Sequence, residues 1–195
     1  KNIVIVGDLK QLPNVIPDKV KEIVKPISDR YNLSEGYRYE NNSLLSSICS
    51  IIPNVPRTML REHYRCHPKI IEFCNKRFYN NQLIIMTEDH NEKDVIKVYK
   101  TVAGNHTRGH FNQRQIDVIK QEILPELQKD KENPEIGIIS PYRKQTTAMQ
   151  IDLSNDIDIS TVHKFQGREK DDIIISSVDN EISEFTDNPN MLNVA

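Results

Sequence analysis

The sequence predicts an α/β protein in which helices cover a mainly parallel sheet, a three-layer α/β/α architecture. Short apolar segments of strand length alternate with amphipathic segments of helix length along the chain. Several of the apolar segments run directly into polar, loop-forming residues. In open α/β sheets ligands bind beyond the carboxyl ends of the strands, so we expect one ligand-binding edge assembled from these loops.

The first part of the chain contains one expected strand and two expected helices. Residues 1–6 form an apolar run that predicts a buried strand, and residues 7–13 form the polar loop after it. Residues 18–24 favour a short helix and residues 44–52 an amphipathic one. Residues 31–43 are rich in Tyr, Asn, Ser and Glu without a period, which is typical of a surface loop or an insertion.

A basic and aromatic loop over residues 61–68 precedes the next expected helix. Pro68 suits the first turn of a helix, and apolar side chains follow it at helical spacing. These side chains are Ile70, Phe73, Cys74 and Phe78. Residues 95–99 alternate between apolar and polar side chains, which predicts a strand.

The remainder of the chain alternates helices and strands. Residues 112–129 predict a long helix with one apolar face, formed by Ile116, Ile119, Ile123 and Leu127. Pro125 should kink that helix or end it early. Strands are expected at residues 136–139, 157–161 and 173–178, and a helix at residues 143–153.

The composition is that of a globular domain. The 195 residues are 37% hydrophobic and 28% charged, and the apolar residues are clustered, which argues against disorder. No apolar stretch approaches the ~18 residues that a membrane span needs. The cysteines (Cys49, Cys66, Cys74) are odd in number and irregular in spacing, which suits free thiols in a reducing, cytoplasmic compartment. Together with His63 and His67 they match no ordinary zinc-ligand pattern, so we expect no metal site.

Positive charge gathers in the loops although the net charge is −2. Residues 61–82 carry an excess of Lys and Arg over Glu, and the loops near residues 143 and 168 carry further basic side chains, namely Arg143, Lys144, Lys164, Arg168 and Lys170. Nucleic-acid binding depends on such local patches and not on global charge. The alternative is an ordinary set of solvated surface charges.

Gln11 and Arg65 are the candidate catalytic residues. Gln11 lies in the loop after the first expected strand, and a Gln amide can sense a terminal phosphate and orient a water beside it. Arg65 stands between a Tyr and a Cys-His pair at a helix entrance, and a guanidinium matches phosphate oxygens two at a time. Taken singly, Gln11 has the alternative of an ordinary turn residue, and Arg65 that of a partner for Glu62 or a helix cap.

Two further loops carry candidate binding residues. Residues 140–145 (Ser-Pro-Tyr-Arg-Lys-Gln) follow a strand and open a helix. Pro141 and Tyr142 therefore lie at the ligand-binding edge, where the Tyr142 ring can stack on a base. Residues 161–172 place Thr161 and His163 where they can face a nucleic-acid backbone. In the same loop Gly167 permits close backbone approach, and Glu169 can accept a hydrogen bond from a ribose. The alternatives are a packing tyrosine and solvated polar groups.

Together these motifs resemble superfamily 1 helicases, in the branch of the 5′-to-3′ RNA and DNA helicases of messenger-RNA decay and DNA replication. Residues 7–13 (Gly-Asp-Leu-Lys-Gln-Leu-Pro) match one family motif, with Asn14 in place of a second Pro. Residues 64–68 (Tyr-Arg-Cys-His-Pro) match another, with Cys66 in place of Met. Residues 140–145 and 161–171 match two more in family order, and residues 192–195 look like the start of the last motif.

The resemblance implies two RecA-like domains with ATP and Mg²⁺ bound between them, both held mainly by the first domain. Gln11 and Arg65 would then meet the γ-phosphate, and Gly167 and Glu169 would line the ATP cleft. The strand of DNA or RNA would pass Pro141, Tyr142, Thr161 and His163, which are the expected nucleic-acid contacts. The sequence contains no Gly-x-x-x-x-Gly-Lys-Ser/Thr phosphate loop, so we expect this chain to supply the partner half of the nucleotide site.

The expected organisation is a fragment of a longer helicase, since both ends look cut from something longer. Residues 1–17 would be the tail of the first RecA-like domain, residues 18–59 a connecting or inserted segment, and residues 60–195 an incomplete second domain. The expected partners are single-stranded DNA or RNA and the N-terminal RecA-like domain of the same protein. One alternative is a non-catalytic nucleic-acid-binding or regulatory module with a degenerate helicase fold. Another is a nuclease or metal-dependent hydrolase, for which Asp171 and Asp172 are the candidate ligands.

Overall fold

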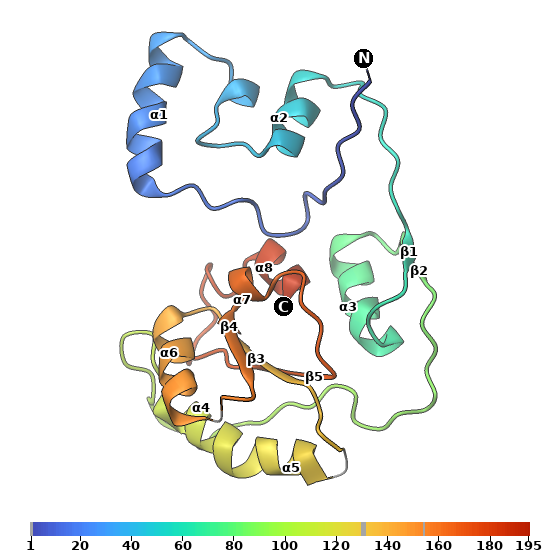
Figure 1. Ribbon diagram of the computed structural model, residues 1–195, viewed down its shortest axis with the longest axis vertical. Helices are drawn as coiled ribbons and strands as arrows, with labels where there is room; N and C mark the ends of the chain where they lie inside the picture. The colour runs from blue at the N-terminus through green and yellow to red at the C-terminus, as the bar shows by residue number, and fades with distance from the viewer. Residues whose placement is uncertain (1, 130–131, 154) are drawn as a thin grey trace. The chain divides into compact units, whose positions relative to one another are not determined.

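A computed structural model describes residues 2–129, 132–153 and 155–195 of the chain (Figure 1). It consists of two compact units, Lys1–Glu92 and Lys93–Ala195, which we call the N-terminal and C-terminal units and describe separately. Within the described residues, the helices are all too short or too polar to traverse a lipid bilayer.

The C-terminal unit is built on a three-stranded parallel sheet in the order β4-β3-β5. Its strands are β3 (Ile136–Ser140), β4 (Asp158–Thr161) and β5 (Asp172–Ile175). The central strand β3 is buried along its whole length, as its continuous apolar run predicts. The expected α/β fold with a mainly parallel, RecA-like sheet is therefore confirmed. Strand β5 ends earlier than expected, at Ile175, because Val178 has a positive φ of 70° that a strand cannot contain.

Helices pack on this sheet in the alternation that the sequence predicts. They are α4 (Gln113–Val118), α5 (Leu124–Lys129), α6 (Arg143–Asp152), the short α7 (Val162–Phe165) and α8 (Pro189–Val194). A single hydrophobic core joins α4, α5 and α6 to one face of the sheet, and it includes Ile116, Ile136, Ile138, Met149, Ile159 and Ile174. Because side chains alternate along a strand, Gly137 and Ile139 belong to the opposite face.

Pro125 does not end the long helix that the sequence predicts over residues 112–129. A π-helical turn, Ile119–Ile123, joins α4 to α5, and the Leu124 amide donates to the Ile119 carbonyl five residues back. Such a wide turn shifts the hydrogen-bond register of a helix locally. The missing amide of Pro125 is thus accommodated inside a continuous helix, which starts at the Asn112 cap.

The regular secondary structure of the N-terminal unit is mainly helical. Its elements are α1 (Asp18–Arg30), a 3₁₀ turn (Glu35–Tyr37), α2 (Leu44–Ile51), β1 (Glu62–His63), α3 (Pro68–Phe78) and β2 (Ile84–Ile85). Helix α1 is longer than predicted, whereas α2 and the start of α3 at Pro68 are confirmed. The short strands β1 and β2 pair in parallel.

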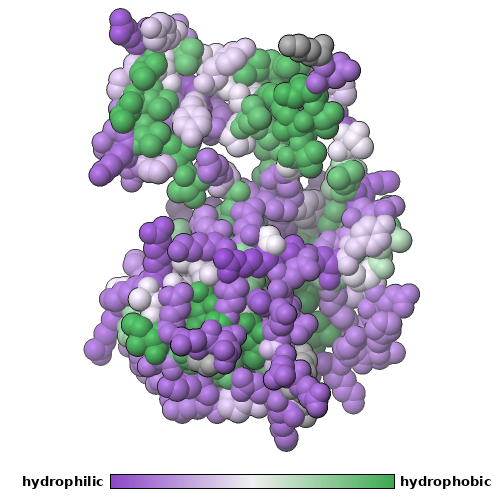
Figure 2. Space-filling model, in the orientation of Figure 1, coloured by the Kyte–Doolittle hydropathy of each residue, from purple (hydrophilic) through white to green (hydrophobic). Residues whose placement is uncertain are grey.

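Two expected strands are wrong. Residues 2–6 and 95–99 form no strand, and most of their apolar side chains are exposed, with Val4 87% and Val98 90% accessible. A strand needs a hydrogen-bonded neighbour, and apolar alternation alone does not provide one. Figure 2 shows that many apolar side chains lie on the surface of the N-terminal unit. Its exposed apolar residues include Ile23, Ile27 and Leu44.

The buried face of α3 also differs from the predicted one. Ile71, Asn75 and Phe78 are buried, whereas Ile70 and Phe73 are largely exposed. Asn75 is buried because its side chain satisfies the backbone of Leu83 twice, accepting from the amide at 2.9 Å and donating to the carbonyl at 3.2 Å. A polar side chain that replaces a backbone partner is invisible to a search for apolar periodicity.

Candidate functional site

The loops after β3 and β4 meet at the carboxyl edge of the C-terminal sheet. Ser140, the last residue of β3, is in register with Thr161, the last residue of β4, and the two strands run parallel. Pro141 and Tyr142 therefore leave the sheet beside Thr161 and His163. The structure thus brings these four predicted nucleic-acid contacts to one edge.

Tyr142 belongs to an aromatic group that no sequence motif predicts. Its ring stacks on His110 with centroids 4.2 Å apart and on Phe185 with centroids 5.3 Å apart. Its hydroxyl donates to Asp179 Oδ2 at 2.5 Å. Burial, followed by this hydrogen bond, raises the pKa of Tyr142, so the phenol remains a donor at neutral pH. His110 and Phe185 lie far from Tyr142 in sequence, and no motif includes them.

Thr161 and His163 flank the start of α7, a short helix where the sequence predicts an irregular polar loop. Thr161 is buried at the helix start, and His163 is exposed. The buried side chain of Phe165 fixes α7 on the sheet face opposite Ile138. A Cβ on Gly137 would lie 2.5 Å from the Phe165 ring, so the contact depends on glycine in the central strand.

Substituting Gly137→Ala should displace Phe165 and with it α7. We expect a loss of about 1–3 kcal/mol in the free energy of unfolding, because the overlap with the aromatic ring forces a shift of packed atoms. Urea unfolding of the chain measures the effect, with Ser177→Ala at an exposed position as the control. Equal midpoints for the two variants would show that α7 does not depend on this contact.

Gly167 and Glu169 lie beyond α7, where the chain turns back towards the amino ends of the strands. Gly167 has a φ of +83°, which favours glycine, and no atom lies within 4 Å of where its Cβ would stand. Arg168 Nη1 donates to both carboxylate oxygens of Asp158, at the start of β4, at 2.9 Å each. The Asp171 amide donates to the carbonyl of Glu135, just before β3. These contacts attach the segment that contains Gly167 and Glu169 to the amino-end side of β4 and β3.

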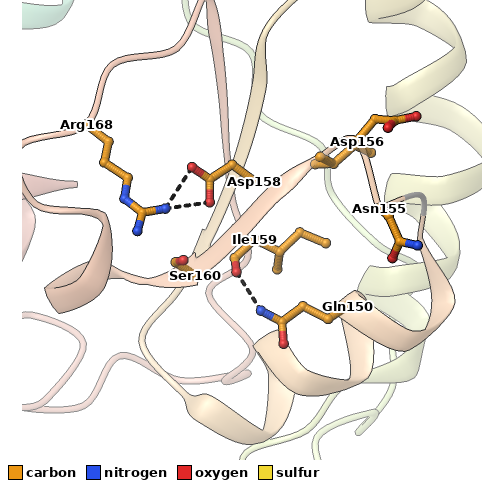
Figure 3. Close-up of a pocket in the computed structure, with 8 residues that line it drawn as sticks. Gln150, Asn155, Asp156, Asp158, Ile159, Ser160 and Arg168 are labelled. Atoms are coloured by element: carbon orange, nitrogen blue, oxygen red, sulfur yellow. Dashed lines mark hydrogen bonds and ion pairs between the residues drawn. The ribbon is translucent and has the colours of Figure 1, made fainter.

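A shallow pocket of about 600 Å³ lies beside this returning segment (Figure 3). Its lining is mainly polar and comes from Gln150 in α6, from residues 155–157 before β4, from β4 itself and from Arg168. Gln150 Nε2 donates to the Ile159 carbonyl at 2.8 Å, and the Arg168–Asp158 ion pair closes another side. The predicted site residues do not line this pocket, so it carries none of the roles assigned to them.

A buried polar network lies behind the carboxyl edge. Gln145 accepts from the Asn112 amide at 2.9 Å and donates to the Asn112 carbonyl at 3.2 Å and to Ser176 Oγ at 3.1 Å. Gln115 Oε1 accepts from Ser176 Oγ at 2.7 Å and from the Val178 amide at 3.0 Å. The network ties the start of α4 to α6 and to the chain after β5. Gln145 belongs to a recognised motif, but Asn112 and Gln115 do not.

In the N-terminal unit, Asp8 organises the loop that contains Gln11. Its carboxylate accepts from the Lys10 amide at 2.8 Å, from Gln11 Nε2 at 3.3 Å and from the Tyr79 hydroxyl at 2.6 Å. The loop is thereby attached to the C-terminal end of α3. Arg65 is exposed and precedes the N-terminal end of the same helix. The meeting of these residues with Glu169 at one ATP cleft stays a prediction.

His67, Asp89 and Glu92 bring three potential metal-ligand atoms within 4.8 Å of one another. His67 Nδ1 accepts from the Lys69 amide at 3.2 Å, which places the proton of the neutral ring on Nε2, facing the carboxylates. Lys69 adds a cation 3.1 Å from Asp89 and lowers the pKa of that carboxyl. These groups form an ion-pair cluster that supports the start of α3.

Of the cysteines, Cys74 has a pKa raised by burial and then by Cys66, which favours the neutral thiol.

A parallel sheet, flanking helices and polar loops at the strand ends define a RecA-like α/β domain. The AAA domain family matches residues 40–195, and the chain belongs to this family. It is similar to human "Probable helicase senataxin", with 27% identity over 90% of this chain and 7% of that protein. It is 29% identical to the Saccharomyces cerevisiae "DNA polymerase alpha-associated DNA helicase A" over 90% of this chain and 29% of that protein.

A third relative, an uncharacterized ATP-dependent helicase of Methanocaldococcus jannaschii, is 25% identical over 100% of this chain and 30% of that protein. The resemblance to superfamily 1 helicases is confirmed by these matches. The chain spans less than a third of the length of each of these three relatives.

Proposed function

We propose that this chain is part of an ATP-dependent nucleic-acid helicase or translocase, in which it supplies the arginine and sensor half of the ATP cleft and part of the single-strand surface. The observation that carries the proposal is the register of β3 with β4, which gathers the motif residues Pro141, Tyr142, Thr161 and His163 at one edge. The family supports helicase-type activity. The cytoplasmic location stays a prediction from the cysteines.

The proposed nucleotide roles fall on four residues. Gln11 orients the attacking water, and Arg65 binds the γ-phosphate through its planar guanidinium. Gly167 fits the rim of a nucleotide site because its open, positive-φ backbone leaves room for a ligand, and Glu169 accepts from the ribose. Bound ATP supplies the phosphoanhydride bond whose cleavage drives such a protein. These residues are not a set of oxygen ligands for Mg²⁺, so we place the metal on the N-terminal RecA-like domain.

The proposed partners are a single strand of DNA or RNA and that N-terminal RecA-like domain. The boundaries at residues 17 and 59 are part of the proposal. Asp171 and Asp172, the candidate ligands of the hydrolase alternative, have structural roles instead. Asp171 Oδ2 accepts from the Glu135 amide at 3.0 Å, and Asp172 begins β5. Both carboxylates thus flank a strand.

The isolated 195 residues should not hydrolyse ATP, because the sequence has no phosphate loop. A phosphate-release assay on highly purified chain, with and without single-stranded nucleic acid, measures this. The complete protein, assayed in parallel, should show turnover that a single strand stimulates. No turnover in the complete protein would favour the non-catalytic nucleic-acid-binding module, and turnover in the isolated chain would refute the assignment of a partner half.

A further inference from the structure

The loop that presents Arg65 is held through both backbone polar groups of the next residue, Cys66. The Cys66 amide donates to His63 Nε2 at 2.8 Å. The Cys66 carbonyl accepts from Thr87 Oγ1 at 2.8 Å. His63 lies in β1 and Thr87 directly follows Met86, whose amide donates to the His63 carbonyl at 2.9 Å. The position of the loop is therefore tied to the β1–β2 pair on both sides.

The hydrogen bond to Cys66 defines the chemical state of His63. A ring nitrogen that accepts from a backbone amide carries no proton, so the neutral ring has its proton on Nδ1. An imidazolium cannot accept at Nε2, and protonation would turn the clamp into a repulsion between two donors. His63 is thus suited to hold the loop only while it is uncharged.

We infer that His63 is a positioning residue for Arg65, and that its uncharged Nε2, with Thr87 on the other side, fixes the loop from which the guanidinium reaches the phosphate. The inference rests on the proposed role of Arg65 and adds a residue that the motif-based assignment leaves without a function. His63 does not itself touch the nucleotide in this account. It acts by restricting the backbone next to the arginine.

The surroundings of His63 favour the uncharged ring. Burial, followed by the positive charge of Arg65, lowers the pKa of His63 below its ordinary value. The residues that β2 and its continuation contribute are Ile84, Ile85, Met86 and Thr87, which carry no charge. The nearby carboxylate of Glu62 is bonded to the Tyr64 hydroxyl. The clamp is therefore intact at neutral pH and is lost as the pH falls through the lowered pKa of His63, which lies below the ordinary value for histidine.

The clamp itself can be observed in the 195-residue chain by NMR. Nitrogen shifts of His63 should show a protonated Nδ1 and an unprotonated Nε2 at neutral pH, and the Cys66 amide should exchange more slowly than in His63→Leu. His90→Gln, at an exposed position in the same unit, is the matched control and should leave Cys66 unchanged. A proton on Nε2 of His63 at neutral pH would overturn the inference whatever the ATPase results.

Turnover in the complete protein tests the link to Arg65. His63→Leu should lower kcat about 10- to 100-fold with little change in KM for ATP, since a small misplacement of a catalytic group has effects of this order. His63→Gln, whose amide oxygen accepts without titrating, should restore most of the turnover and remove the loss at acid pH. In an Arg65→Ala background, His63→Leu should have no further effect.

The outcomes separate the two proposals. A loss from His63→Leu that persists in full in the Arg65→Ala background overturns the inference and leaves the proposed function standing. Normal turnover in Arg65→Ala alone overturns the proposed role of Arg65, and the inference with it. Because His63→Leu can unfold the unit, the thermal unfolding of each variant is measured first. If His63→Leu is unfolded, the turnover of His63→Gln and Thr87→Val is compared in its place.

Discussion

Replacing Arg65 with alanine should lower the nucleic-acid-stimulated ATPase rate of the complete protein by about 10³-fold, the order of effect for an arginine that neutralises charge on a transferring phosphate. Binding of a single strand should change little, because the proposed strand contacts lie on the other unit. Steady-state phosphate release and fluorescence anisotropy with a labelled oligonucleotide measure the two quantities.

A matched variant separates charge from geometry at this position. Arg65→Lys keeps the charge but loses the planar fork of donors, so it should recover only part of the rate. Arg77→Ala, a basic residue at the last turn of α3, should leave turnover within about twofold of the original if local charge is not the cause. Turnover preserved in Arg65→Ala would exclude the arginine from the phosphate site.

Replacing Gln145 with leucine should have the largest effect on stability. The side chain is fully buried and makes hydrogen bonds to both backbone groups of Asn112 and to Ser176. Leucine fills a similar volume but leaves these partners unsatisfied, and each unsatisfied buried group costs about 1–3 kcal/mol. We therefore expect a loss of about 3 kcal/mol or more in the free energy of unfolding, measured by urea denaturation.

Gln150→Leu is the control, since Gln150 lies on the same helix, is exposed and makes one hydrogen bond, to the Ile159 carbonyl. It should cost less than about 1 kcal/mol. Similar losses for the two variants would mean that the network behind the carboxyl edge is not a significant source of stability.

The sequence predicts the C-terminal unit better than the N-terminal one, for a physical reason. Residues 136–139 are continuously apolar because β3 is paired on both sides and covered on both faces, so their pattern is unambiguous. Residues 2–6 have a similar pattern but no neighbouring strand among the described residues. The apolar pattern of a segment indicates its tendency to be buried. It does not indicate whether a neighbouring strand is present to pair with the segment.

Some features of the candidate site could likewise be predicted from the sequence, and others could not. The gathering of Tyr142 and Thr161 at one edge follows from the parallel arrangement of β3 and β4, which the alternation of elements predicts. The contacts of Tyr142 with His110 and Phe185 could not be predicted, because they depend on the path of two loops. Asn112 and Gln115 were also missed, since they lie on a helix that the sequence describes only through its apolar face.

The left-handed backbone of Val178 has a consequence for how this protein tolerates sequence variation. A β-branched residue rarely adopts a φ of 70°. Here the Val178 amide donates to the Gln115 side chain, and the Val178 carbonyl accepts from the side chains of Thr107 and Asn112. The next residue, Asp179, holds the Tyr142 hydroxyl. Substitutions at residues 112 and 115, outside every motif, can therefore redirect the aromatic group at the carboxyl edge of the sheet, and an inventory of motifs alone would not detect such divergence.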